Sequence, residues 1–392
     1  MVAWPIIASS FLQLTLGIAD IAMVGRLGAD PLAAIGFARQ AIMVMISLFF
    51  GYNQSTNALI ARHIGAKDPQ KADKAAFQSI LFVTYLGGII TIAAFLSLGS
   101  LVKLISLDDV VTDQAVSYIR VYAACLIIVL YTFILNGIFQ GMGHSRVQFY
   151  VMGVANILNI ILNYFFIFGD QYIAYIPIHG LGLSVQGAAI ATVISRLIAA
   201  AILLFLLASG RYPVKLRFYS LKLDWEYIRP LNVIGLPTAV QAMGRQAAML
   251  FVFTAAARSS LGKYAIGALT VGLQTEAIAF FPVLGMMFAT TAMVGQNLGA
   301  KKIDRAEEAT WIAVKMAFLY MVPWALAYSL FPVQLIHIFT NDTNVVYPTA
   351  IYLIMGSVFL TTMANLPIFG ALRAAGDATV PMLINLFCLL FF

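Results

Sequence analysis

Long apolar runs alternate with short polar segments along the whole chain. A run of about 20 apolar residues is long enough to cross a bilayer as a helix. We therefore expect eleven membrane-spanning helices, over residues 4–25, 38–61, 78–101, 116–139, 148–169, 183–208, 232–257, 267–296, 309–331, 346–368 and 380–392. The first run is longer than the core of a signal peptide and has no basic segment before it, so it predicts a permanent helix.

The composition agrees with a membrane protein. Of 392 residues, 62% are hydrophobic and 10% are charged, and the mean hydropathy is +0.92. Soluble domains contain about 45–50% apolar and about 25% charged residues. A soluble core and a disordered chain are both excluded, and the predicted fold class is an all-α polytopic membrane protein.

The positions of Lys and Arg predict the topology. These residues gather after the even-numbered helices, at 62–74, 211–229 and 301–305. Basic loops remain in the cytoplasm, so we expect a cytoplasmic N-terminus. The formal net charge of +7 is spread over these loops and forms no continuous basic patch with aromatic residues. A nucleic-acid partner is therefore not expected.

The chain contains an internal repeat. Residues 58–67 (ALIARHIGAK) resemble residues 292–301 (AMVGQNLGAK), and 234 residues separate Gly65 from Gly299. Other matching residues share nearly the same spacing. A duplication with six helices in each half predicts two lobes of parallel orientation, related by a pseudo-two-fold axis along the membrane normal.

The repeat also predicts the domain organisation. We expect an N-terminal lobe over residues 1–209, a cytoplasmic linker over 210–230 and a C-terminal lobe over 231–392. A complete second lobe requires a twelfth helix, which would lie beyond residue 392, so about 11 of 12 helices are expected here. A genuine eleven-helix protein is the alternative.

Polar residues gather at one depth of the predicted N-terminal lobe. Asp20 lies about six residues, roughly 9 Å, below the outer end of the first helix. The alternating directions of the helices place Asn159, Asn163, Thr192 and Tyr118 at a similar depth. A charge within the membrane costs roughly 2.5–3.5 kcal/mol or more, so an unpaired acid points to function. For the two amides and the threonine, interhelical hydrogen bonding is the structural alternative.

This group of oxygen-bearing side chains suits a small monovalent cation or a proton. We identify Asp20, Asn159, Asn163, Thr192 and Tyr118 as the candidate cation-coupling site. Na⁺ bound by the first four residues is one possible occupant, and H⁺ is the other. No other metal site is expected.

Candidate substrate-binding residues come from both halves. Gln13 lies on the same helical face as Asp20, while Arg245 and Glu276 fall within the seventh and eighth helices. An ion pair between Arg245 and Glu276 is the structural alternative for these two. Thioether and aromatic side chains offer adaptable contacts for flat organic cations, although ordinary packing also explains them. The candidates of this kind are Met23, Phe49, Tyr52, Phe280 and Met286.

The sequence has no signature of an enzyme. It contains no HExxH, GxSxG, Walker or Gly-rich dinucleotide motif. Cys125 and Cys388 are isolated within apolar runs and match neither a disulfide framework nor a metal site. We expect no enzymatic activity and no cofactor other than the coupling ion.

Five segments resemble the multidrug and toxic compound extrusion (MATE) transporters. They are GIADIAMVGRLG at 17–28, LNGIFQGMGHSRVQF at 135–149, NILNIILNYFFIFG at 156–169, GAAIATVISR at 187–196 and LGAKK at 298–302. The resemblance covers nearly the whole chain and implies two six-helix lobes around a central cavity. An acid in the first helix, with none at the matching place in the seventh, resembles the branch of the DNA-damage-inducible protein F transporters, whose N-terminal lobe carries the cation site.

The resemblance also implies roles for individual residues. It implies that Asp20, Asn159, Thr192 and Tyr118 belong to the cation site, and that Pro5 permits bending of the first helix when Asp20 is protonated. Several relatives have an acid at the position of Asn163. One carboxylate in place of two weakens Na⁺ binding, so proton coupling is favoured over sodium coupling.

These observations predict a secondary active exporter that works by alternating access. Small amphipathic substrates, expected to be cationic, leave the cell against inward movement of H⁺ or Na⁺. The expected location is the plasma membrane of a bacterium or archaeon, and the expected state is a monomer. The alternative is a lipid-linked-oligosaccharide flippase of the same broad superfamily. Such a flippase is expected to line its cavity with several Arg residues, for which the sequence offers mainly Arg196 and Arg245.

Overall fold

The computed structural model describes residues 3–27, 29–104, 109–169, 171–173, 176–178, 180–260, 263–340 and 342–391. The elements of the first half are α1 (Ala3–Gly25), α2 (Ala29–Gly65), α3 (Pro69–Leu104), α4 (Asp109–Ala124), α5 (Leu126–Gly141), α6 (Ser145–Ile167), β1 (Gln171–Ile173), β2 (Ile176–Ile178) and α7 (Ser184–Ala208). Those of the second half are α8 (Trp225–Arg258), α9 (Lys263–Gly299), α10 (Ile303–Leu330), α11 (Pro332–Ile336), α12 (Thr343–Leu360), the 3-10 helix η1 (Thr361–Asn365), α13 (Leu366–Ala375) and α14 (Thr379–Phe391).

Helices occupy all eleven predicted apolar runs. The fourth run holds two helices, α4 and α5, which meet at Cys125 with a bend of 55°. The tenth run is divided among α12, η1 and α13. By length and apolar composition, 7 of the described helices are able to cross a membrane, or 8 if the bent pair is one span. The predicted all-α polytopic membrane fold is confirmed. Its small departure is the antiparallel hairpin β1–β2 between α6 and α7.

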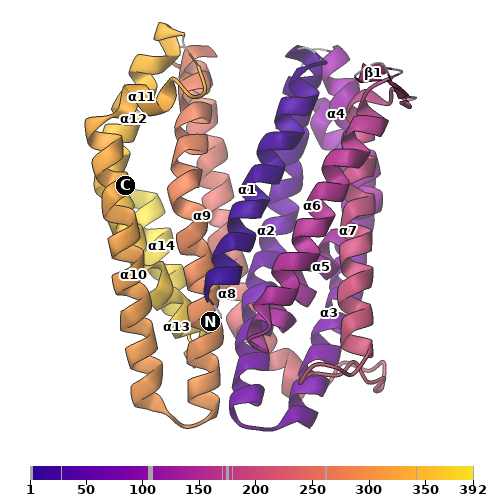
Figure 1. Ribbon diagram of the computed structural model, residues 1–392, viewed down its shortest axis with the longest axis vertical. Coiled ribbons are helices and arrows are strands. Elements are labelled where there is room, and N and C mark those ends of the chain that lie inside the picture. The colour runs from indigo at the N-terminus through magenta and orange to yellow at the C-terminus, as the bar shows by residue number, and fades with distance from the viewer. Residues whose placement is uncertain are drawn as a thin grey trace.

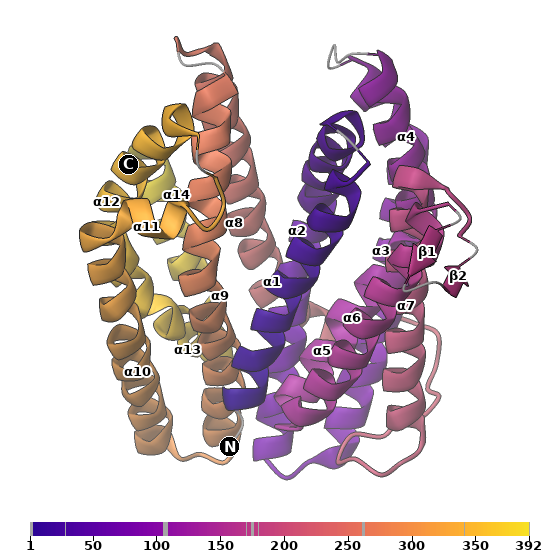
Figure 2. The same ribbon diagram turned by 45° about the horizontal axis from the view of Figure 1, so that its top comes forward.

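The helices form two groups, α1–α7 and α8–α14, which lie side by side (Figure 1). Each group has its own apolar core, with Phe49 and Phe139 fully buried in the first and Met321 and Tyr328 in the second. The two groups diverge toward the end that carries the hairpin and meet at the opposite end (Figure 2). Contacts between the groups involve α2 with α8 and α9, and α1 with α9. Since α1 also packs on α6, it is in contact with both groups.

At the end where the two groups meet, α2 and α9 approach so closely that glycine is required. A Cβ atom on Gly65 would lie 2.0 Å from the main-chain oxygen of Gln296. A Cβ atom on Gly299 would lie 2.0 Å from the main-chain oxygen of Arg62. No side-chain movement relieves an overlap with a backbone oxygen. The two repeated segments of the sequence therefore lie against each other in the structure. We call the end of the bundle where they meet the closed end.

The segment between α7 and α8, residues 211–224, is attached to α3. Asp73 accepts a hydrogen bond from the main-chain nitrogen of Lys215 at 2.7 Å, and Gln78 binds the main chain of the segment at two further points. Both side chains are almost completely buried. The linker is therefore ordered against the first group of helices.

Candidate functional site

Asp20 of α1 is bound directly by an amide of α6. The Nδ2 atom of Asn163 donates a hydrogen bond to Asp20 Oδ1 at 2.6 Å. Asn159, one helical turn away, and Asn163 are both fully buried. The helices are held together nearby by Asn156, whose Nδ2 donates to the main-chain oxygen of Leu12 at 2.9 Å. Asp20 and Asn163, which the sequence placed at a similar depth in the membrane, are therefore also direct neighbours in the structure.

Asn159 connects this carboxyl group to α7. Its side-chain amide lies 3.3 Å from Thr192 Oγ1 and 3.0 Å from the Nδ2 atom of Asn163. The amide atom that faces Asp20 lies 3.0 Å from Oδ1. Four of the predicted coupling residues thus form one network, which we call the Asp20 network: Asp20, Asn159, Asn163 and Thr192.

Tyr118, the fifth predicted residue, lies beside this network. Its ring stacks on that of Tyr122 with centroids 6.0 Å apart and an angle of 18° between the planes. Both rings are buried in α4, and both interact electrostatically with Asp20. Tyr118 is therefore near the acid, and its hydroxyl makes no hydrogen bond to Asp20 among the contacts of the described residues.

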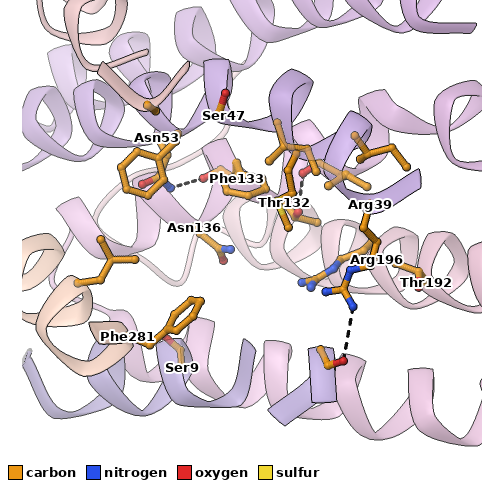
Figure 3. Close-up of a pocket in the computed structure, with 18 of the residues that line it drawn as sticks. Ser9, Arg39, Ser47, Asn53, Thr132, Phe133, Asn136, Thr192, Arg196 and Phe281 are labelled. Carbon is orange, nitrogen blue, oxygen red and sulfur yellow. Dashed lines mark hydrogen bonds between the residues drawn. The ribbon is translucent and has the colours of Figure 1, made fainter. Parts of the chain in front are cut away.

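Two arginines lie close to the Asp20 network. Arg39 Nη1 is 3.5 Å from the main-chain oxygen of Gly17, and Arg196 Nη1 is 3.8 Å from the sulfur of Met152. Both guanidinium groups interact electrostatically with Asp20. Figure 3 shows Arg39 and Arg196 extending toward the same point, with their guanidinium groups side by side.

Arg39 was not among the residues that the sequence singled out. The apolar run at 38–61 placed this residue at the end of a span, where an arginine reaches the interface. In the structure α2 begins at Ala29, so Arg39 lies well inside the helix. Arg196 falls within the sixth predicted helix, and in the structure it lines the same cavity as Asp20.

A cavity of about 350 Å³ lies between the two groups of helices. Its wall comes from α1, α2 and α4–α7 on one side and from α8 and α9 on the other. The charged residues that line it are Asp20, Arg39, Arg196 and Arg245. Apolar side chains cover much of the remainder, including Met43, Phe50, Phe280, Phe281, Leu284 and Phe288.

On the second side of the cavity, Arg245 of α8 covers the face of Phe280, with 5.7 Å from Cζ to the ring centroid. The predicted ion pair with Glu276 is not formed. Glu276 instead accepts a hydrogen bond from the hydroxyl of Tyr352 at 2.7 Å and does not line the cavity. The eighth and tenth predicted helices meet at this bond.

Several predicted substrate contacts lie elsewhere. Phe49 and Tyr52 are buried in the core of the first group, and Met286 is buried in that of the second. Met23 is half-buried against the first core. These four side chains are not among the cavity-lining residues, because they point from their helices into the apolar cores. The side chain of Gln13 lies outside the described part of the chain, and Pro5 is buried near the beginning of α1.

The cavity also contains side-chain amides that the sequence did not single out. Asn53, Asn136 and Gln148 line the wall of the first group, and each has a buried oxygen without a partner within the described chain. The sequence does show that these polar residues lie in the middle of predicted spans. It does not show whether they face the cavity, because periodicity hardly separates the lipid-facing side from the protein-facing side of a helix that is apolar all round.

Known proteins resemble the chain over nearly its whole length. The MatE family model matches residues 5–165 and 241–392. A probable multidrug resistance protein NorM from Thermotoga maritima is 25% identical over 98% of this chain and 81% of its own length. An uncharacterized transporter, YisQ, from Bacillus subtilis is 25% identical over 97% of this chain and 82% of its own.

Solved structures of transporters also resemble the chain over nearly its whole length. A MOP superfamily transporter from Pyrococcus furiosus, whose binding pocket is described as having reverse polarity, has a TM-score of 0.91 and 25% identity. The match covers 99% of this chain and 84% of that one. A MATE crystal structure in complex with MaD3S has a TM-score of 0.88 and 26% identity, covering 98% of this chain and 84% of the other.

Proposed function

The chain belongs to the MATE family of multi-pass membrane transporters, and on this basis we propose that it exports drug-like molecules by antiport with a cation that binds at Asp20. The family is one of transporters and not of enzymes, and the named relatives support multidrug export. We further propose which ion is coupled to transport, in which direction it moves and which residues take part.

The Asp20 network carries the proposal. Asp20 Oδ1, an amide atom of Asn159 and Asn163 Nδ2 all lie within 3.0 Å of one another. An amide presents either a donor or an acceptor, depending on its orientation. If Asn159 presents nitrogen, it donates to an ionised Asp20 and no longer accepts from Asn163 Nδ2. If it presents oxygen, a protonated Asp20 donates to it. Addition of a proton therefore changes the hydrogen bonds of the whole network.

The same geometry favours H⁺ over Na⁺. A sodium ion needs several oxygen ligands around it, but Asp20 Oδ1 already faces the N–H donor of Asn163 at 2.6 Å. A proton needs no ligand shell, and it fits a network of this size.

The position of α1 explains how protonation acts on both halves. Helix α1 packs against α6 and α9, and Ile7 packs on the core of the second group. A change in the hydrogen bonds of Asp20 therefore alters a helix that both groups share. Pro5, buried near the start of α1, is proposed to permit its bending. Coupling requires only that proton and substrate bind the two states with different affinities.

The closed end defines the state of the transporter. It carries the basic loops after α2 and α9, which the charge pattern assigns to the cytoplasm. In this topology the N-terminus is cytoplasmic, the protein lies in the plasma membrane and the cavity is shut off from the inside. Three arginines line the cavity, as the flippase alternative requires, but a volume of about 350 Å³ suits a drug-sized ligand better than a lipid-linked oligosaccharide.

Reconstituted protein tests the coupling. In proteoliposomes with an imposed pH gradient, the wild-type chain should move substrate and Asp20→Asn should lose gradient-driven movement. Asp113→Asn removes an exposed carboxylate on α4 and serves as the matched control. A Na⁺ gradient without a pH gradient should have little effect. Full gradient-driven transport by Asp20→Asn would remove Asp20 from the mechanism.

A further inference from the structure

The charge of the cavity is opposite to what a cationic substrate would need. Three guanidinium groups and one carboxylate line it: Arg39, Arg196, Arg245 and Asp20. Arg39 and Arg196 lie near Asp20 and are partly compensated by it. Arg245 forms no ion pair among the described residues. The uncompensated positive charge is therefore on the side formed by α8.

A second arginine increases the positive charge behind Arg245. Arg373 of α13 is 2% exposed, and it contacts α8 one helical turn before Arg245. Its Nη2 atom donates to Gln241 Oε1 at 2.8 Å, while its Nε has no partner within the described chain. The sequence had placed Arg373 in a loop, whereas it is buried inside the second group. Two neighbouring cations thus occupy this region without a described carboxylate to pair with.

The guanidinium group of Arg245 is exposed at the wall of the cavity and has no ion-pair partner among the described residues. An oxyanion suits this group, since a guanidinium fork binds carboxylate, sulfonate or phosphate with two parallel hydrogen bonds. Phe280 holds the Arg245 side chain from one face, and the guanidinium group lines the cavity. The donor is therefore positioned before any ligand arrives.

The aromatic residues give no separate argument for a cation. One face of the Phe280 ring is already covered by Arg245. Phe50, Phe281 and Phe288 remain as apolar surfaces for a flat ring system. The amides of Asn53 and Asn136 offer either donors or acceptors, so they do not select the sign of a ligand's charge.

We infer that the substrate is an amphipathic aromatic anion of drug size, and that Arg245 binds its carboxylate or sulfonate group. The inference rests on the proposed export function and replaces the expected cationic substrate. The ring system lies against the phenylalanines, and the anionic group faces α8.

Two dyes with the same xanthene ring system test this inference. Fluorescein is anionic at pH 8, and rhodamine 123 is cationic. Fluorescence anisotropy on the purified full chain measures the affinity for each dye without any gradient. The wild-type protein should bind fluorescein more tightly than rhodamine 123. Arg245→Gln should weaken fluorescein binding by about tenfold or more, because a hydrogen bond to a charged group is lost.

Further variants separate charge from folding. Arg245→Lys keeps the charge and should retain much of the affinity, and Arg245→Glu should reverse the preference toward rhodamine 123. Arg305→Gln removes a positive charge from an exposed site on α10 and should change neither affinity. The melting temperature of each variant shows that it is folded.

The possible results distinguish this inference from the proposed function. Tighter binding of rhodamine 123, absence of fluorescein binding, or fluorescein binding that is unchanged in Arg245→Gln would overturn the anion site. If a pH gradient moves rhodamine 123 and not fluorescein, export stands and the substrate class is wrong. If fluorescein binds through Arg245 but no gradient moves it, the site stands and the proposed coupling is wrong.

Discussion

The Nη2 atom of Arg62 in α2 lies 2.6 Å from the main-chain oxygen of Ala375 in α13 and donates a hydrogen bond to it. Its counterpart in the repeat, Gln296 in α9, donates from Nε2 to the main-chain oxygen of Gly141 in α5 at 2.9 Å. The two donor residues are 234 residues apart in the sequence, and so are the two acceptor residues. The two repeats therefore close one end of the bundle with a matched pair of contacts, each made across the boundary between the halves.

The glycines at this end should control the balance between the two states of the transporter. In Gly65→Ala the new methyl group meets the main-chain oxygen of Gln296, so the closed end has to separate. We expect transport to fall by about tenfold, since a cost of about 1.4 kcal/mol changes an equilibrium tenfold. Gly299→Ala, its repeat counterpart, should behave in the same way.

Spin labels measure the separation directly. Cysteines at Gln70 and Asp304, both exposed near the closed end, give a distance distribution by pulsed electron paramagnetic resonance. Gly65→Ala should shift this distribution to longer distances. Gly88→Ala is the matched control, because a Cβ atom there has open space around it. An unchanged distribution in Gly65→Ala would mean that the closed end is not a gate.

The sequence predicts most of the fold because membrane helices leave strong local signals. The apolar runs located the described spanning helices, and the spacing of Gly65 and Gly299 predicted the duplication that appears as two groups of helices. The bend at Cys125 and the division of the tenth run were not predicted. They depend on tertiary packing around α5 and α13, which hydropathy does not report.

The sequence predicted the depth of the candidate site residues in the membrane, but only partly which of them face the cavity. Counting residues placed Asp20 and Asn163 at one level, and the structure brings them together. The same counting could not determine which face of α2 points into the cavity, so Phe49 was chosen and Phe50 lines it instead. Arg373 was assigned to the loop after the tenth predicted helix, because charged residues usually mark the ends of spans.

Gln78 should anchor the linker between the two halves. Its Nε2 donates to the main-chain oxygen of Lys222 at 3.1 Å, and its Oε1 accepts from the main-chain nitrogen of Asp224 at 3.0 Å. Gln78→Ala leaves both groups without these partners, at about 1–3 kcal/mol each. Trypsin should then cleave the linker at least about five times faster. Gln70→Ala, an exposed change on the same helix, should leave the cleavage rate unchanged.

Glu276 should support structure and have little effect on transport. Glu276→Gln retains an acceptor for the hydroxyl of Tyr352, so we expect transport within about twofold of wild type and nearly unchanged stability. Tyr352→Phe should lower stability by about 0.5–1.5 kcal/mol through loss of the same bond. Transport rates and thermal melting test these expectations. A large loss of transport in Glu276→Gln would return this acid to the translocation pathway.

Asn163→Asp should convert the proton site into one that also responds to Na⁺. The new carboxylate would face Asp20 where the amide now lies 2.6 Å away. Two carboxylates so close are not both ionised unless a proton or a cation lies between them. A sodium ion that binds there stabilises the folded protein by mass action, so the melting temperature of Asn163→Asp should rise when NaCl replaces choline chloride. The wild type should show little response.

The double variant Asp20→Asn with Asn163→Asp moves a single carboxylate across the network without creating a pair, so its melting temperature should again be insensitive to Na⁺. An equal Na⁺ response in the double variant would show that the ion binds outside the Asp20 network.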